Sequence, residues 1–255
     1  MVVFHSDLDN TLIYSYKHDI GSEKECVEIY QNREVSFMSK KSYDLLKAVK
    51  DKVIFVPTTT RTQEQYNRID LGIGVPHLAL VCNGGVLLAD GREDIKWYEE
   101  SVNLVKDCRR ELEKSEIYLK TDEYRCFEVR NIRDLFVFTK SDKPERTMDG
   151  LKGILNLSLV DVFCNGIKVY VVPKKMSKGM AVQRLRKRMK AEFVIAAGDS
   201  EFDISMLHIA DIGIVPPKLR ILSGERKKIV RADEERVYSD WVLEYVLRYM
   251  DKKGQ

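Results

Sequence analysis

The sequence predicts an α/β protein whose parallel sheet is wound with helices and interrupted by a smaller α+β unit. Short apolar runs alternate with helical patterns at both ends of the chain, which is typical of a parallel sheet. In the middle of the chain, charged helices and strand patterns suited to an antiparallel sheet replace that alternation. The 255 residues suffice for one or two domains with a hydrophobic core.

The first part of the chain carries three apolar runs that predict buried strands. The expected elements, in order, are a strand at 2–4, a polar stretch to Asn32, a helix around Leu46, a strand at 53–56, a helix at 63–69 and a strand at 78–81. We assign all three strands to the parallel sheet, because helices separate them.

The alternation breaks after Gly85 and resumes at Pro173. Between them we expect a helix over 102–112, strands at 126–129 and 135–138, a helix opened by Pro144, and strands at 157–163 and 168–172. Beyond Pro173 we expect a helix after Ser177, strands at 193–197 and 211–215, and a last helix over 241–250. The sequence thus predicts a core domain of residues 1–84 and 173–255, interrupted by a domain of residues 85–172.

Composition narrows the range of possible partners. With 43 Lys and Arg against 40 Asp and Glu, the net charge of +3 gives no global attraction to nucleic acid or to an anionic membrane. No run approaches the roughly 18 apolar residues of a membrane helix. The five cysteines form no Cys-x-x-Cys pair, which indicates reduced thiols. Since no secretory signal is visible either, we expect a cytoplasmic protein.

Four carboxylates follow two of the predicted strands. Asp7 and Asp9 come after the first strand, and Asp199 and Asp203 come after the strand at 193–197. Ligands of wound parallel sheets bind beyond the carboxyl ends of the strands, so we expect these side chains to converge. Converging carboxylates repel one another unless a cation lies among them, and oxygen ligands suit Mg²⁺. Turn and helix-cap roles are the alternative for each pair taken alone.

Candidate phosphate-binding groups also lie at the end of a predicted strand and at the start of a predicted helix. Thr58-Thr59-Thr60-Arg61 follows the strand at 53–56 and offers hydroxyls and backbone amides. Lys178 falls in the first turn of a helix, where an ammonium can neutralise a phosphate oxygen. Each signal alone is weak, because threonine runs are common in turns and lysines are common on surfaces. Together, and in this order, they are specific.

The chain resembles the haloacid dehalogenase-like superfamily of phosphatases with an aspartate nucleophile. The resemblance rests on Asp7-Leu8-Asp9-Asn10-Thr11, the segment 58–61, Lys178 and Gly198-Asp199-Ser200-Glu201-Phe202-Asp203, with Val81-Cys82-Asn83-Gly84-Gly85 in support. It implies a Rossmann-like three-layer core with a parallel sheet. It also implies that residues 85–172 form a large α+β cap, similar to that of sucrose-phosphate phosphatases, mannosyl-3-phosphoglycerate phosphatases and Cof-type sugar phosphatases.

The resemblance implies a role for each motif residue. Asp7 would be the nucleophile and Asp9 the general acid and base. Mg²⁺ would be held by Asp7, the backbone carbonyl of Asp9 and Asp199, with Asp203 acting directly or through water. Thr59, Lys178 and Asn83 would bind the phosphoryl group, and Asn83 would also help to organise the site. The substrate would be a small phosphorylated metabolite, in particular a sugar phosphate.

Two departures from the family pattern leave questions open. Thr60 stands where relatives usually have Gly, so the choice among Thr58, Thr59 and Thr60 stays open. Phe202 stands where many relatives have Asn, which changes the surroundings of the fourth motif.

Two alternative functions compete with the phosphatase. A phosphomutase uses the same two aspartates. An anion- or RNA-binding module would use a basic helix side and a second basic run (Lys178, Arg184, Arg186, Lys187, Arg188 and Lys190, with Arg226, Lys227 and Lys228). Because no aromatic residues for base stacking are interleaved with these cations, a solvated helix face is favoured over nucleic-acid binding. The sequence gives no oligomeric state.

Overall fold

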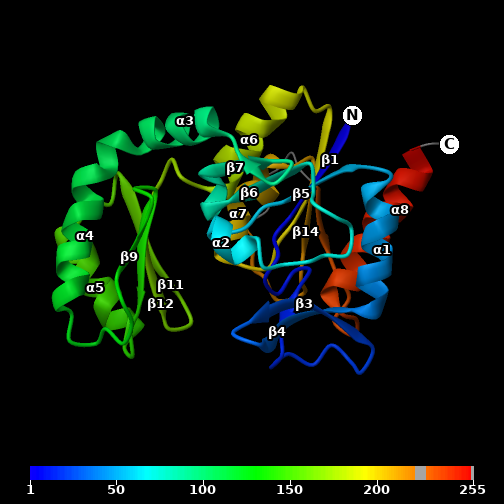
Figure 1. The fold of residues 1–255 in the computed structure, drawn as a ribbon. Helices are drawn as coiled ribbons and strands as arrows, with labels where there is room; N and C mark the ends of the chain where they lie inside the picture. Colours follow the sequence, from blue (N-terminus) through cyan, green and yellow to red (C-terminus); the bar gives the residue numbers. More distant parts are fainter. Residues whose placement is uncertain (222–227, 254–255) are drawn as a thin grey trace. The chain divides into compact units, whose positions relative to one another are not determined.

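The computed structural model describes residues 1–221 and 228–253. The chain divides into two compact units, one of Met1–Asp94 with Lys178–Gln255 and one of Ile95–Ser177 (Figure 1). Residues 85–94 therefore pack with the larger unit and residues 173–177 with the smaller one, unlike the division predicted at 84/85 and 172/173. The assignment of these units to a core domain and a cap domain stays a prediction.

The larger unit is built on a five-stranded parallel sheet. Its order is β15-β14-β13-β1-β5, and every neighbouring pair is parallel. The strands are β1 (Val2–Ser6), β5 (Ile54–Pro57), β13 (Phe193–Ala197), β14 (Ile212–Val215) and β15 (Lys228–Arg231). The predicted α/β class with a parallel sheet is confirmed. Strand β15 was not predicted, because its two apolar residues are flanked by charges.

Helices cover this sheet and complete the Rossmann-like three-layer core. On one side α1 (Lys40–Lys50) packs against α8 (Tyr238–Lys253), and on the other α6 (Lys178–Met189) packs against α7 (Glu201–Ile209) (Figure 1). A short α2 (Gln63–Tyr66) follows β5 and is closed at its start by a capping box between Thr62 and Gln65. The helices predicted after Ser177 and over 241–250 are confirmed.

A three-stranded antiparallel sheet follows β1, where the sequence predicted only a polar stretch. It contains β2 (Tyr14–Ser15), β3 (Lys24–Tyr30) and β4 (Arg33–Ser39), in the antiparallel order β2-β4-β3. The turn between β3 and β4 holds Gln31 and Asn32 at φ of 51° and 60°. Positive φ at two consecutive turn residues matches the right-handed twist of a hairpin, and Asn tolerates it.

The predicted strand at 78–81 exists, but its place in the parallel sheet was wrong. β6 (Leu78–Val81) pairs antiparallel with β7 (Val86–Ala89), which pairs with β8 (Arg92–Glu93). A single parallel bridge between Thr58 and Leu80 joins this meander to the end of β5. The tight turn through η1 (Cys82–Gly84) folds the chain straight back, so β7 and β8 remain with the larger unit.

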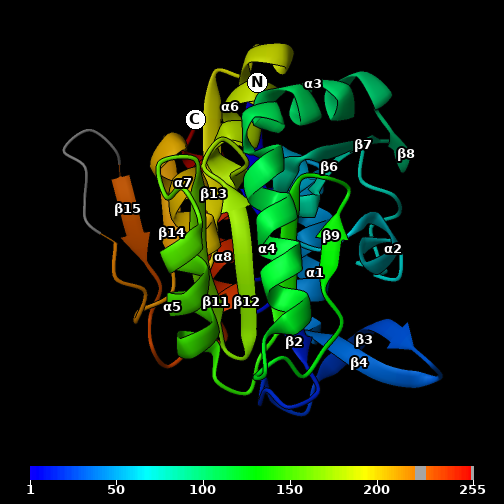
Figure 2. The same ribbon diagram turned by 90° about the vertical axis from the view of Figure 1, so that its left-hand side faces the viewer.

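The smaller unit has a four-stranded antiparallel sheet in the order β11-β12-β10-β9. Its elements are α3 (Ile95–Val105), η2 (Lys106–Cys108), α4 (Arg109–Thr121), β9 (Arg130–Ile132), β10 (Phe136–Lys140), α5 (Pro144–Ile154), β11 (Val160–Asn165) and β12 (Lys168–Pro173). Helices α4 and α5 lie against one face of the sheet and enclose an apolar core with it (Figure 2). An independent core of this kind supports the predicted α+β unit.

Two details of the smaller unit differ from the prediction. The helix expected over 102–112 is broken by η2, where Val105 takes φ of −107° and ψ of 6°. Residues 126–129 form no strand, and the strand lies at 130–132 instead, because Arg130–Ile132 is the segment in register with Phe136–Phe138.

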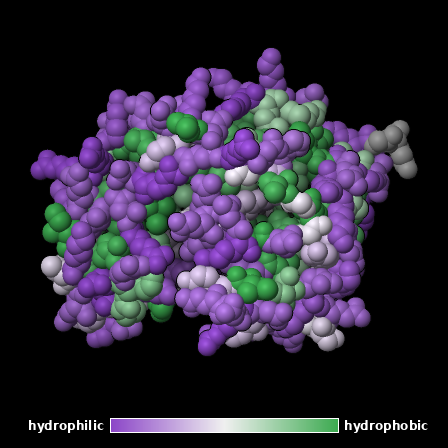
Figure 3. All heavy atoms as spheres, in the orientation of Figure 1, coloured by the Kyte–Doolittle hydropathy of each residue, from purple (hydrophilic) through white to green (hydrophobic). Residues whose placement is uncertain are grey.

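Charged and polar residues dominate the face of the molecule in Figure 3, with apolar side chains scattered among them. Among residues 1–221 and 228–253, no helix is both long enough and apolar enough to span a bilayer.

Candidate active site

The carboxyl ends of three parallel strands meet at the first motif. Asp7 donates its backbone N–H to the Ala197 carbonyl at 2.9 Å, so it continues the pairing of β1 with β13. On the other side of β1, the Thr58 N–H donates to the Ser6 carbonyl at 2.7 Å. Because these bonds fix the strand ends side by side, the segments that follow β1, β5 and β13 share one edge of the sheet.

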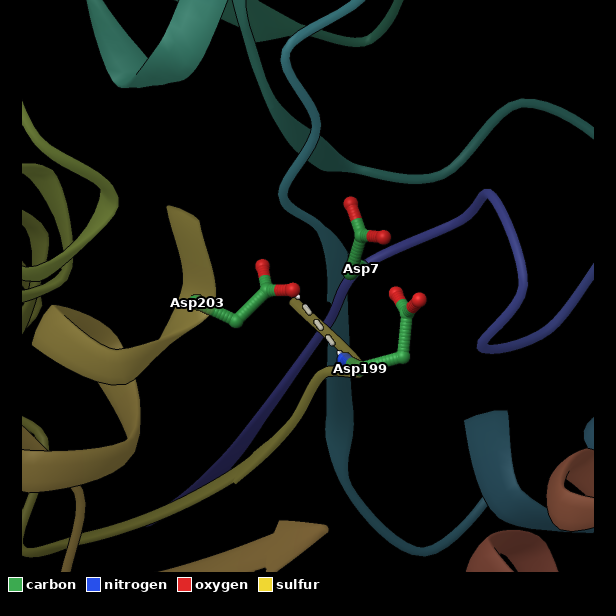
Figure 4. Close-up of side chains that lie close together, drawn as sticks. All are labelled: Asp7, Asp199 and Asp203. Carbon is green, nitrogen blue, oxygen red and sulfur yellow. Dashed lines mark hydrogen bonds between the residues drawn. The ribbon is translucent and has the colours of Figure 1, made fainter. Parts of the chain in front are cut away.

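Three of the four predicted carboxylates converge at this edge. Asp7, Asp199 and Asp203 each present an oxygen, and these oxygens lie within 4.8 Å of one another (Figure 4). Asp7 and Asp203 are buried, with 5% and 0% of their surface exposed. The sequence therefore predicted which strand ends bring these carboxylates together.

The cation nearest to this cluster is Lys178, the first residue of α6. Its Nζ lies 2.5 Å from Oδ1 of Asp7 and 2.5 Å from Oδ1 of Asp203. The side chain is 1% exposed, so the ammonium is almost entirely removed from water. A buried ammonium between two carboxylates is stable only as a paired group, which makes Lys178 part of the cluster and not of a surface.

Asp203 holds the loop that carries Asp199. Its Oδ2 accepts hydrogen bonds from the backbone N–H of Asp199 at 3.1 Å (dashed in Figure 4) and of Ser200 at 3.0 Å, and from the Ser200 hydroxyl at 2.8 Å. These contacts also form the capping box of α7. Gly198 is required beside them, because a Cβ there would lie 2.3 Å from the Cβ of Asp203.

Burial and mutual repulsion raise the pKa values of two carboxylates of the cluster. Burial raises the pKa of Asp7 well above its usual range, and Asp203 and Asp199 raise it further while Lys178 lowers it. Burial and the neighbouring Asp203 raise the pKa of Asp199 to about 6. The pKa of Lys178 is raised by Asp203 and Asp7 despite an opposing effect of burial. One ammonium therefore does not balance the three carboxylates.

Asp9 departs from the convergence that the sequence predicted for all four carboxylates. Both of its carboxylate oxygens accept hydrogen bonds from the guanidinium of Arg61, from Nε at 2.8 Å and from Nη2 at 2.7 Å. The fork of the guanidinium fits a carboxylate in this two-point geometry. Asp9 lies two residues beyond Asp7, yet its side chain joins the segment that follows β5.

The three threonines after β5 occupy different surroundings. The Thr58 hydroxyl donates to the Val56 carbonyl at 3.1 Å and lies 3.0 Å from Nδ1 of His5, within the core. The Thr59 hydroxyl accepts the Arg61 N–H at 3.1 Å. Thr60 is partly exposed. Thr58 and Thr59 are both fully buried, but the Thr58 hydroxyl has two partners in the core and the Thr59 hydroxyl only accepts one N–H, which favours Thr59 or Thr60 for contact with a ligand.

Asn83 lies against the same segment. Its N–H donates to the Thr59 carbonyl at 3.0 Å, and its backbone is in the left-handed region at φ of 57°. The side chain is buried at 2% exposure. The structure thus brings Asn83 and Thr59 together as neighbours.

One buried charged residue next to the site, Glu28, was not predicted from the sequence. Glu28, on β3, is 3% exposed and lies 2.9 Å from Nη1 of Arg61. The available signal was the hairpin turn at Gln31 and Asn32, since recognising that turn assigns residues 24–30 to a strand.

The predicted basic helix side is weaker than the sequence suggests. Lys178 is buried, Arg186 pairs with Asp211 at 3.0 Å, and Arg188 pairs with Asp94 at 2.5 Å. Of the second basic run, Arg226 and Lys227 lie outside the described residues. These neutralised cations give little support to the nucleic-acid alternative.

Comparison with known proteins gives a family match over part of the chain and two curated relatives. Residues 91–215 match the model of the haloacid dehalogenase-like hydrolases. Over this segment the chain is similar to that family. It is similar to a phosphoglycolate phosphatase of Methanopyrus kandleri, with 28% identity over 52% of this chain and 56% of that protein. A phosphoglycolate phosphatase of Sulfurisphaera tokodaii is 28% identical over 64% of this chain and 65% of its own. The chain thus spans less than two thirds of the length of these curated relatives.

Solved structures share the haloacid dehalogenase-like fold over nearly the whole chain. The sucrose-phosphatase of Synechocystis, solved with sucrose and phosphate, gives a TM-score of 0.67 at 17% identity, covering 98% of each chain. A haloacid dehalogenase-like hydrolase of B. subtilis gives 0.59 at 17% identity, covering 97% of this chain and 99% of its own. At this level of identity the likeness establishes the fold.

Proposed function

We propose that the protein is a Mg²⁺-dependent phosphohydrolase that cleaves a small phosphomonoester through an aspartyl-phosphate on Asp7. The observation that carries the proposal is the buried cluster of Asp7, Asp199 and Asp203 around the Lys178 ammonium, at the carboxyl ends of β1 and β13. This arrangement combines a nucleophilic carboxylate with the charges that an anionic substrate needs.

The cluster fits Mg²⁺ by the chemistry of its donors. All its candidate ligands are carboxylate oxygens, and a hard cation prefers these. We assign Asp7, Asp199 and the backbone carbonyl of Asp9 as ligands, in accord with the family resemblance. Because both oxygens of Asp203 accept hydrogen bonds from protein groups, Asp203 is better suited to holding Asp199 and Lys178 or to acting through water. Bound Mg²⁺ would reduce the repulsion between the carboxylates and a phosphate dianion.

The remaining residues have proposed roles around the phosphoryl group. Asp7 attacks phosphorus, and Asp9 donates a proton to the leaving oxygen and then accepts one from the attacking water. Thr59 and Lys178 bind phosphoryl oxygens, on which negative charge is spread. Asn83 holds the Thr59 backbone in place, as its hydrogen bond to the Thr59 carbonyl supports.

The proposed substrate is a small phosphorylated metabolite, in particular a sugar phosphate. The similar proteins carry the names phosphoglycolate phosphatase and sucrose-phosphatase, which supports a small phosphorylated metabolite and is compatible with a sugar phosphate. The inserted unit is the candidate specificity domain, as the resemblance implies. Five free cysteines support a reducing, cytoplasmic environment.

The deciding experiment compares the wild type with Asp7→Asn on a panel of sugar, glycerate, glycolate and nucleotide phosphates, with Mg²⁺ or with EDTA. We expect hydrolysis by the wild type only with Mg²⁺ and none by Asp7→Asn. Release of inorganic phosphate distinguishes hydrolysis from the phosphoryl relocation of a mutase. A wild type that hydrolyses no member of the panel in the presence of Mg²⁺ contradicts the proposal.

A further inference from the structure

Glu28 is a buried carboxylate that the proposed chemistry does not use. It is 3% exposed and accepts a hydrogen bond from the Ser36 hydroxyl at 2.6 Å. Two guanidinium groups complete its surroundings, Arg61 at 2.9 Å and Arg68 at 3.1 Å. A buried carboxylate is tolerated only with such partners, and the partners become fixed in turn.

Arg61 connects Glu28 to the active site. Its Nε and Nη2 bind the two oxygens of Asp9, while its Nη1 contacts Glu28. The guanidinium is planar and rigid, so fixing one side of it at Glu28 fixes the direction of the N–H groups that bind Asp9. With 14% of its side chain exposed, Arg61 has little freedom to swing into solvent.

The backbone around Glu28 is shaped to present it to Arg61. The pairing of β3 with β4 shifts register on both sides of Glu28, between Cys26 and Glu28 and between Glu28 and Ile29. A bulge of this kind redirects a side chain within a strand. A bridge from Glu28 to Ile69, with a hydrogen bond from the Asp70 N–H to the Val27 carbonyl at 2.8 Å, ties this part of β3 to the segment after α2.

We propose that Glu28 and Arg61 are positioning residues that hold the Asp9 carboxylate where it accepts a proton from water during hydrolysis of the aspartyl-phosphate. This inference rests on the proposed function. In that step the water oxygen bonds to phosphorus, a water proton passes to Asp9, and the bond between phosphorus and the Asp7 oxygen breaks. The products are inorganic phosphate and the free Asp7 carboxylate. Because Arg61 donates N–H groups to both oxygens of Asp9, the carboxylate is held in one orientation beside Asp7.

An aryl phosphate separates the two halves of the reaction. The p-nitrophenolate leaving group needs little proton donation, so transfer of its phosphoryl group to Asp7 depends weakly on Asp9. Hydrolysis of the aspartyl-phosphate still needs the base. Slower hydrolysis after an unchanged first step produces a rapid burst of p-nitrophenolate, followed by a slow steady rate.

The experiment records p-nitrophenolate release in the millisecond range for Glu28→Gln and for Arg61→Lys with saturating Mg²⁺. Glu28→Gln retains the size of the side chain and Arg61→Lys retains the charge without the fork. We expect kcat to fall roughly tenfold to a hundredfold, as for partial loss of a general base, with KM falling in parallel. The burst should approach one p-nitrophenolate per active site. Glu244→Gln, which breaks the 2.6 Å ion pair between Glu244 and Arg236 in the same unit, is the matched control and should behave as the wild type.

Two outcomes overturn the inference. The first is an unchanged kcat in both variants. The second is a loss of rate without a burst, which places the defect in the first step. A burst reduced in proportion to the steady rate in Glu28→Gln indicates loss of folded protein, and Arg61→Lys then decides between these results. A wild type that shows no hydrolysis at all contradicts the proposed function instead.

Discussion

The ammonium of Lys178 lies 2.5 Å from a carboxylate oxygen of Asp7, and both side chains are buried. Lys178 begins α6 and Asp7 follows β1, so this contact joins parts of the chain that are 171 residues apart in sequence. It provides part of the charge balance of the site, and its removal should affect stability and activity together.

Lys178→Met should destabilise the protein by about 3–5 kcal/mol and abolish measurable activity. The change leaves the carboxylates of Asp7 and Asp203 buried without their cation. Urea unfolding at pH 7 in EDTA measures the loss of stability. Combining Lys178→Met with Asp7→Asn should restore part of it, since one unbalanced charge then disappears. If the loss of unfolding free energy in the double variant equals the sum of the losses in the two single variants, the contact between Lys178 and Asp7 contributes nothing to folding.

Mg²⁺ should stabilise the wild type and should not stabilise Asp199→Asn to the same extent. A ligand present at a hundred times its dissociation constant adds about 2.7 kcal/mol to the free energy of unfolding. Thermal unfolding over a range of MgCl₂ concentrations measures the effect. The control is Glu201→Gln, an exposed acid beside the site, which should keep the full shift. Equal shifts in both variants would place the metal elsewhere.

His5 should make the protein less stable as the pH falls from about 6.5 towards 3. Burial lowers the pKa of His5 to about 3, so the unfolded chain takes up a proton that the folded chain refuses. Stability from this group is fully present above the unfolded pKa of about 6.5 and is lost as the pH falls, with a slope of up to about 1.4 kcal/mol per pH unit. The free energy of unfolding should lose this slope in His5→Asn when both proteins are measured from pH 7 to 4. An identical pH dependence in the two proteins would contradict the prediction.

Gly198→Ala should lower both stability and kcat. The added Cβ meets the Cβ of Asp203 at 2.3 Å and its Cγ at 2.5 Å, so the carboxylate that holds Asp199 must move. Overpacking of this kind costs about 1–3 kcal/mol. In contrast, a Cβ at Gly153 in α5 meets nothing within 4 Å, and Gly153→Ala should stabilise the helix by up to about 1 kcal/mol. Urea unfolding and steady-state rates compare the two variants, and a Gly198→Ala protein with wild-type values would rule out tight packing at this loop.

Sequence patterns predicted the elements whose environment is simple. The apolar run Phe193–Ala197 became β13 with the same bounds, because a strand buried on both faces is apolar throughout. Pro144 begins α5 as expected at a first helical position. The run Leu78–Val81 is equally apolar, but its pairing partner is chosen by the turn at 82–84, and periodicity carries no information about that choice.

The candidate site was likewise predicted from the sequence only in part. The strand ends located Asp7, Asp199 and Asp203, because topology alone brings them together. The ion pair between Asp9 and Arg61 depends on side-chain direction, which a motif does not encode. Glu28 lies in β3, a strand with an irregular burial pattern and a bulge, so alternation of apolar and polar residues does not reveal it.

The order of strands in the parallel sheet also bears on the biosynthesis of the protein. The central pair joins β1, made first, to β13, which begins at Phe193. While the intervening segment is being translated, Asp7 has emerged without Lys178, Asp199 or Asp203. A nascent chain of the first hundred residues therefore cannot bind the metal or the phosphate in the manner proposed. Assembly of the site must therefore wait until Asp199 and Asp203, in the last quarter of the chain, have been made, and β1 has no β13 to pair with until then.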